Sequence, residues 1–208
     1  MNKVTLLSLP FFIVMPALSV AAPCVPYDNV VYSLQADGAT GTLTKSQACT
    51  GDANSGAYAI TSQIDVKKAI FSRQVTQNAT GTYTSPNTIG AQSFTTTSDK
   101  DASLPSGTLD TLSLVLYLSD TLDAKTPSFM PIPLFYNGKT ISVQCAIKDL
   151  NTTITSNSGQ NITVTNITCA AVDNSTVLNY SFGRDRLHML LAATVIEGDE
   201  TKMTMRIN

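Results

Sequence analysis

Residues 139–171 read KTISVQCAIKDLNTTITSNSGQNITVTNITCAA, and two arms of this stretch alternate apolar and polar side chains. The residues that share one face are Ile141, Val143, Cys145 and Ile147 on the first arm and Thr165, Ile167, Cys169 and Ala171 on the second. Such alternation is typical of half-buried β-strands. If the polar segment between the arms turns the chain near Asn157, Cys145 lies opposite Cys169. The stretch therefore predicts an antiparallel hairpin with a cross-strand disulfide.

The chain has four cysteines, Cys24, Cys49, Cys145 and Cys169, which allow three pairings. The hairpin register favours Cys145 with Cys169, and this leaves Cys24 for Cys49. A redox or metal-binding pair would need closer spacing or a neighbouring histidine, so we expect structural disulfides. Because disulfides persist in oxidising compartments, the cysteines also indicate export.

The N-terminus, residues 1–22, reads MNKVTLLSLPFFIVMPALSVAA. One lysine, a short apolar run and small residues before the expected cleavage site are typical of a secretory signal peptide. We expect a mature chain of residues 23–208 that forms a single β-rich domain without a transmembrane segment. The expected location is the periplasm, with secretion as the alternative.

Charge is sparse, since charged residues make up 13% of the sequence. Lys3 is the single charge of the expected signal peptide, so the mature chain would carry 12 basic and 15 acidic residues, a net charge of −3. No basic cluster supports a nucleic-acid partner. The many threonines suit the exposed faces of β-strands.

Further strand signals run along the whole chain. Tyr58, Ile60, Ser62 and Ile64 alternate onto one face, Asn137-Gly138 between apolar runs is a strong hairpin signal, and the C-terminal part predicts a final three-strand meander. We expect one curved antiparallel sheet or half-barrel of about eight to ten strands, with one short helix near residues 108–122.

The expected helix, residues 108–122, reads TLDTLSLVLYLSDTL. Both a strand and a helix period fit this apolar stretch, but the flanks favour a helix, with Thr108 as N-cap, Asp110 in the first turn and Pro127 beyond the end. The stretch is too short to span a bilayer. We expect its leucine side to face the concave sheet, as the plug or wall of any cavity, with Ser113 and Thr121 on the opposite, polar side.

Residues that could carry chemistry are few, and we assign no catalytic, cofactor or metal residues. His188 is the single histidine and has no nucleophile motif beside it. The methionines could bind Cu(I) and the carboxylates Ca²⁺, but a strand core and solvated turns are favoured. These residues are Met189, Met203 and Met205, and Asp99, Asp101, Glu197, Asp199 and Glu200.

Three segments together suggest a family: LDTLSLVLYL, SFMPIPLFYNGKTISVQCAI and LHMLLAATVIEGDETKMTMRI. Their order resembles the bacterial exported proteins grouped as domain of unknown function 3108, over about residues 30–207. The sequence departs from that family at Leu191-Ala192, where a Leu-Pro pair is usual. The resemblance implies a curved antiparallel sheet in the periplasm, and it implies no activity and no site residues.

These observations predict an exported, non-enzymatic envelope protein that binds a lipid or other apolar ligand inside a curved sheet. The alternative is a secreted or surface interaction module, adhesive or virulence-associated, with an envelope or host protein as partner. A hydrolase ranks third, because it would need His188 or a carboxylate pair in a cleft.

Overall fold

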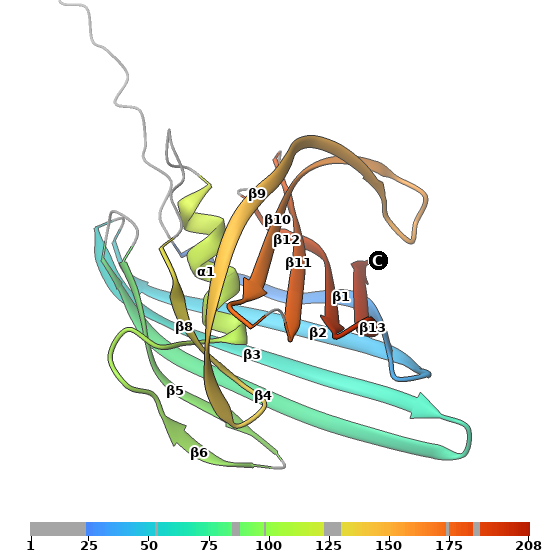
Figure 1. Cartoon of the computed structure of the whole chain (residues 1–208), viewed down its shortest axis with the longest axis horizontal. Helices are drawn as coiled ribbons and strands as arrows, with labels where there is room; N and C mark the ends of the chain where they lie inside the picture. The colour runs from blue at the N-terminus through green and yellow to red at the C-terminus, as the bar shows by residue number, and fades with distance from the viewer. Residues whose placement is uncertain are drawn as a thin grey trace, which may run out of the picture.

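One β-sheet curls around one helix (Figure 1). The computed structural model describes residues 24–208 except 53, 85–87, 98, 123–129, 174 and 185–187, and it leaves out the side chains of residues 99–101. The expected signal peptide lies outside the described residues. Within them, the elements are β1 (Tyr27–Ala36), β2 (Ala39–Gly51), β3 (Ser55–Lys68), β4 (Phe71–Thr84), β5 (Thr88–Thr96), β6 (Asp99–Ser103), β7 (Leu109–Asp110), α1 (Thr111–Thr121), β8 (Ile132–Tyr136), β9 (Lys139–Thr155), β10 (Asn161–Ala171), β11 (Thr176–Gly183), β12 (Leu190–Glu197) and β13 (Glu200–Ile207).

The strand order is β6-β5-β4-β3-β2-β1-β13-β12-β11-β10-β9-β8-β7. The first strand therefore pairs with the last, and this antiparallel pair of β1 and β13 joins two meanders into one sheet. Neighbouring strands run antiparallel except β7 and β8, which are parallel. The predicted architecture is confirmed, with thirteen strands in the described residues where about eight to ten were expected.

The hairpin of β9 and β10 has the register that the sequence predicts. Cys145 pairs with Cys169 and Ile147 with Ile167. A bulge at Asn166 shifts the pairing beyond it, so that Asn161 lies opposite Thr155. The Asn137-Gly138 turn between β8 and β9 is also confirmed, and both residues have positive φ, at 49° and 76°.

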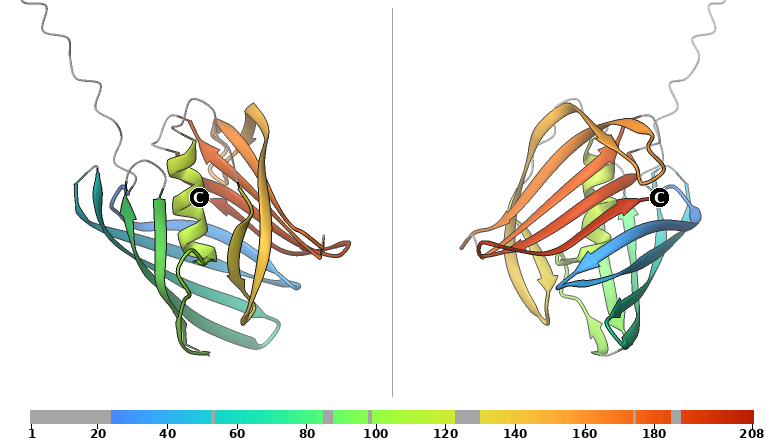
Figure 2. Two further views of the ribbon diagram at one scale, coloured as in Figure 1. Left: turned by 60° about the vertical axis from the view of Figure 1, so that its left-hand side comes forward. Right: turned by 90° about the vertical axis from the view of Figure 1, so that its right-hand side faces the viewer.

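The curled sheet does not close through hydrogen bonds. Its edge strands, β6 and β7, are the two ends of the strand order. Across the seam, the rings of Phe94 on β5 and Phe135 on β8 meet edge to face, with centroids 6.2 Å apart. Helix α1 lies inside the curl, and the left view of Figure 2 shows it beside this seam. The aromatic contact and the helix therefore connect the two ends of the sheet, which backbone hydrogen bonds would connect in a closed barrel.

Helix α1 begins later than the sequence predicts. Leu109 and Asp110 pair with Leu134 and Phe135 of β8 as the short strand β7, so the helix starts at Thr111. The N-cap is therefore Asp110, and the prediction of Thr108 was wrong. Its side chain accepts hydrogen bonds from the backbone N–H groups of Leu112 and Ser113.

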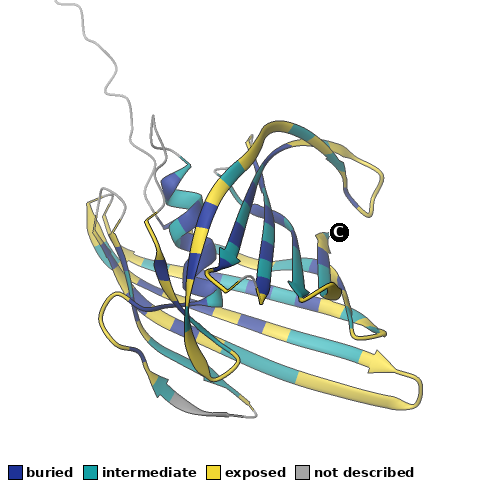
Figure 3. Ribbon diagram, viewed as in Figure 1, coloured by how far each residue is buried: buried dark blue, intermediate teal, exposed yellow. Residues whose placement is uncertain are grey.

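The side of α1 opposite the leucine side, which the sequence predicts to be polar, is also buried at Ser113 and Thr121. Ser113 and Thr121 are enclosed together with the leucines, because the sheet wraps around the helix (Figure 3). Each hydroxyl is satisfied: Ser113 binds the Asp110 carboxylate, and Thr121 donates to the Tyr117 carbonyl oxygen. Within the described residues no helix has the length and apolar character that crossing a bilayer would require.

Two tyrosine–glycine pairs shape the inner face of β3 and β4. Tyr58 pairs with Gly81, and Gly56 pairs with Tyr83. A Cβ atom at either glycine would lie within 2.4 Å of the facing tyrosine hydroxyl, so only glycine leaves room for the rings to lie across the strands. The Tyr58 hydroxyl then reaches the helix and donates to Ser113 Oγ at 2.7 Å. This contact holds the first turn of α1 over the sheet.

Candidate ligand-binding cavity

The interior of the curl contains a cavity of about 810 Å³. Its volume is in the range of pockets that enclose one small ligand. The first turns of α1 cover it through Thr111, Leu112 and Val115, so the prediction that the helix would form a wall of the cavity is confirmed. The strands β11 to β13 supply an apolar wall made of Leu178, Tyr180, Ala193, Val195, Met203 and Met205.

The cavity extends to the hairpin turns at one rim of the sheet. Asp37, Asn137 and Gly138, from the β1–β2 and β8–β9 turns, line it. These turns and the β12–β13 turn lie along the lower right rim in the left view of Figure 2. Glu197 connects two of them, because its Oε1 accepts from the Tyr136 hydroxyl at 2.7 Å and from Asn137 Nδ2 at 3.3 Å. This rim is the mouth of the cavity, and the side chains of Tyr136, Asn137 and Glu197 there are hydrogen-bonded to one another.

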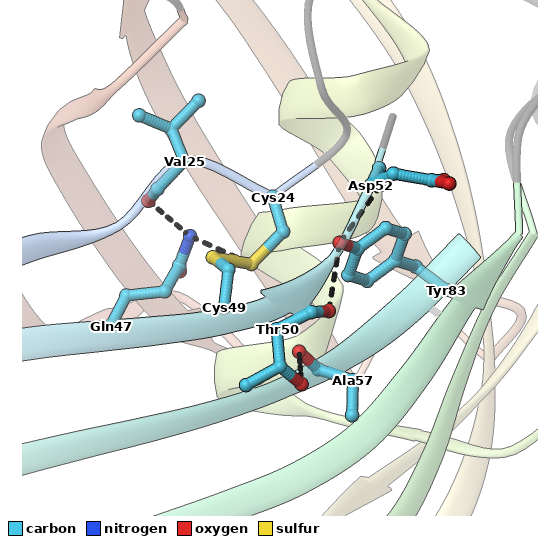
Figure 4. Close-up of a disulfide and its surroundings, with 8 residues drawn as sticks. All are labelled: Cys24, Val25, Gln47, Cys49, Thr50, Asp52, Ala57 and Tyr83. Carbon is cyan, nitrogen blue, oxygen red and sulfur yellow. Dashed lines mark hydrogen bonds between the residues drawn. A yellow bond between two sulfur atoms is a disulfide. The ribbon is translucent and has the colours of Figure 1, made fainter. Parts of the chain in front are cut away.

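The opposite end is fastened by the disulfide between Cys24 and Cys49 (Figure 4). Gln47 points inward beside it, and its Nε2 donates to the Val25 carbonyl oxygen at 2.9 Å. The Tyr83 hydroxyl contacts the carbonyl oxygens of Thr50 and Asp52, which lie at the end of β2. The first described residues are therefore tied to the sheet at the end far from the mouth.

A row of polar side chains crosses the cavity floor. Lys45, Ser62, Gln77 and Thr96 are successive register partners on β2, β3, β4 and β5, and all four line the cavity. Along β2 the lining residues run from Leu43 near the mouth to Lys45 farther in. The cavity is therefore amphipathic, with an apolar wall on one side and a polar row on the other.

Lys45 is the charged member of this row and is 3% exposed. Its Nζ lies 5.8 Å from the centroid of the Tyr27 ring, and within the described part of the chain no hydrogen bond or ion pair is found for it. Burial lowers the pKa of the Lys45 ammonium to about 8, although the Asp110 carboxylate nearby raises it. A buried ammonium without a hydrogen-bonding partner is costly.

Asp110 does not supply that partner. Its carboxylate accepts from Leu112 N at 2.8 Å, Ser113 N at 3.0 Å and Ser113 Oγ at 2.5 Å. Burial raises the pKa of this carboxyl group, and the hydrogen bonds to Ser113 and Leu112 oppose the rise. The negative charge of Asp110 is thus held by the positive end of the helix.

Ser62 is the second unsatisfied member of the row. Its side chain is fully buried, and its Oγ has no hydrogen-bond partner in the described residues. Native proteins seldom leave a buried hydroxyl unpaired. Lys45 and Ser62 therefore line the same cavity, and neither Lys45 Nζ nor Ser62 Oγ has a hydrogen-bonding partner among the described residues.

The residues considered for chemistry from the sequence lie at several places in the fold. His188 has a positive φ of 54° before β12, and its carbonyl oxygen accepts from Ser119 on the helix. Met203 and Met205 lie on the inner side of β13, as expected for core residues, whereas Met189 precedes β12. Glu200 binds Lys202 at the β12–β13 turn, where Asp199 also lies. The side chains of Asp99 and Asp101 lie outside the described residues.

Both disulfides that the sequence favours are present, Cys24–Cys49 and Cys145–Cys169. They indicate an exported protein that folds in an oxidising compartment outside the cytoplasm. Cys145 and Cys169 are buried in the core. They join β9 to β10 on the inner side of the sheet.

Among solved structures, the chain is similar to the β-barrel-like protein of domain of unknown function 1849 from Brucella abortus, known from a crystal structure. The TM-score is 0.53 at 14% sequence identity, over 90% of this chain and 98% of that chain. At this identity the likeness shows the fold alone. No protein-family model and no curated protein matches the sequence, so the resemblance to domain of unknown function 3108 stays a prediction.

Lys45 was not predicted from the sequence as a functional residue. A signal was present, because Leu43, Lys45, Gln47 and Cys49 alternate in the segment TGTLTKSQACT. The inward position of Cys49, which its disulfide requires, places Lys45 on the inner face as well. A lysine at an inward position of a strand is rarely buried without a reason. Ser62 was correctly placed on the same face as Ile60 and Ile64.

Proposed function

We propose that this chain is an exported, non-enzymatic binding protein of the bacterial envelope, located in the periplasm, that encloses an apolar ligand inside its curved sheet. The single observation that carries the proposal is the 810 Å³ cavity with its apolar wall and its mouth at the rim. Side chains fill the interior of most small barrels, so an unfilled interior of ligand size favours binding.

A cavity-filling substitution tests this proposal. Ala193 is buried on β12 and lines the cavity, whereas its neighbour Ala192 is partly exposed and lines a groove on the outer face. Ala193→Phe should weaken the binding of a neutral apolar naphthylamine dye about tenfold or more, because the ring would occupy ligand space. Dye fluorescence titrations measure the affinity, and circular dichroism checks the fold.

Ala192→Phe is the matched control, since it adds the same ring to the other face of the same strand. It should leave the dye affinity unchanged. Equal dye affinity in the wild-type protein and both variants would contradict the proposal, as would the absence of dye binding to the wild-type protein.

The interaction module ranks second. The β3–β4 hairpin projects from the sheet, and at its tip the side chains of Ile70 and Phe71 are 90% and 75% exposed (Figure 3). Exposed apolar patches often mark contacts with partners, but two side chains form a small patch. This alternative stays a prediction.

A further inference from the structure

We propose that the ligand is a single-chain amphiphile with an anionic head, and that Lys45 and Ser62 bind this head at the inner end of the cavity. The inference rests on the proposed function and names the chemical class that the cavity selects. Its basis is the pairing of two buried polar groups on neighbouring strands, Lys45 opposite Ser62, both lining the same cavity.

The polar groups that line this cavity favour a ligand with a negatively charged head. Lys45 Nζ offers donors that no described residue accepts, and Ser62 Oγ is a further donor without a partner. A carboxylate or phosphate oxygen between them would accept from both and would neutralise the buried ammonium. A neutral polar head would satisfy the hydroxyl but would leave the ammonium charge buried and unpaired.

The head binds at the inner end because the two described cations that line the cavity, Lys45 and Lys202, differ in their partners. At the rim, Lys202 is held by Glu200, and Asp37 and Glu197 add negative charge. A carboxylate head placed there would meet like charge, whereas Lys45 is a buried cation without an ion-pair partner in the described residues. The tail then extends toward the mouth along the apolar wall of β11 to β13.

Asp110 does not exclude an anion from this position. Its carboxylate is directed to the first turn of α1, where it accepts from two backbone N–H groups and from Ser113 Oγ. The positive end of the helix offsets its charge. The ammonium of Lys45 therefore remains available to form an ion pair with an anionic ligand.

The test compares ligands with the same tail and different heads by dye displacement from the purified protein. Laurate should bind wild-type protein about 30-fold or more tightly than dodecanol, because an anion that pairs with a buried charge gains this much in affinity. Dodecyl phosphate should share the preference over dodecanol, and the tighter of the two anions identifies the head as carboxylate or phosphate. Dodecylamine should bind no better than dodecanol.

Lys45→Met should lower the affinity for laurate to the affinity for dodecanol, and the affinity for dodecanol itself should be unchanged or higher. Ser62→Ala should weaken laurate by about two- to tenfold, the effect of one lost hydrogen bond, and is a second variant with an intact lysine. Lys67→Met is the matched control, because Lys67 is an exposed lysine near the end of β3 and its loss should leave the preference for laurate intact.

Three results would overturn the inference in separable ways. If wild-type protein binds laurate and dodecanol equally, the inference of an anionic head is wrong, while the apolar cavity still stands as a binding site. A preference for laurate that survives in Lys45→Met would place the head elsewhere. If no ligand displaces the dye and the dye itself does not bind, the proposed function fails together with the inference.

Discussion

Lys45→Met is expected to make the ligand-free protein more stable at neutral pH, by about 3 kcal/mol in the free energy of unfolding. Burial lowers the pKa of Lys45 from 10.5 to about 8, and this shift already includes the attraction of Asp110. Met fills a similar volume without a charge, so the variant loses the cost of keeping an ammonium in the core. Chemical denaturation at pH 7 measures the difference.

The same shift predicts how stability changes with pH. Below about pH 8 Lys45 is protonated in both the folded and the unfolded protein. Between about pH 8 and 10.5 the unfolded chain binds a proton that the folded protein has released, so the free energy of unfolding should rise with pH. Buried tyrosines oppose this rise near pH 10, because burial raises the pKa of Tyr32 and Tyr58.

Comparison with Lys45→Met removes the tyrosine contribution, because both proteins contain the same tyrosines. The stability gap between variant and wild type should therefore narrow as pH rises from 8 toward 10. Lys67→Met, an exposed control, should change stability by no more than about 0.5 kcal/mol at any pH. A variant less stable than wild type at pH 7 would show that Lys45 is a structural ion-pair residue and not a site kept for a ligand.

Removal of the Cys145–Cys169 disulfide should cost about 3–4 kcal/mol in the free energy of unfolding, because the bond closes a loop with a sequence separation of 24. The double variant Cys145→Ala/Cys169→Ala avoids unpaired thiols. Thermal unfolding should show a lowered Tm. The loss should come from the less constrained unfolded chain, so ligand binding at saturating concentration should persist below the new Tm.

Cys24→Ala/Cys49→Ala is the matched comparison, since that disulfide has a sequence separation of 25. The chain-entropy effect should be nearly the same for both bonds. Unchanged Tm values in both double variants would contradict the assignment of the disulfides as stabilising cross-links.

Local patterns predicted much of this fold because strand alternation and turn chemistry are read from neighbouring residues. The alternation around Cys145 and Cys169 predicted their register, and Asn137-Gly138 predicted its turn. The start of α1 was missed because Leu109 and Asp110 pair with β8, which lies more than twenty residues later in the chain. Local helix signals carry no information on such a partner.

The site was harder to predict because its character depends on distant strands. Lys45 becomes a buried cation only where β2 faces the wall of β11 to β13 and the first turn of α1 covers both. A cavity is volume that side chains leave unfilled, and one sequence pattern does not show how strands far apart in the chain pack together. An inward lysine beside a disulfide-bonded strand end is the signal that could have found it.

Native mass spectrometry of the protein purified from the cells that produce it naturally tests the central claim most directly. We expect one bound amphiphile with an acidic head per chain of the wild-type protein, and no bound amphiphile in Lys45→Met. An empty wild-type protein, obtained under conditions that preserve other lipid complexes, would contradict the claim that this interior is a ligand-binding site.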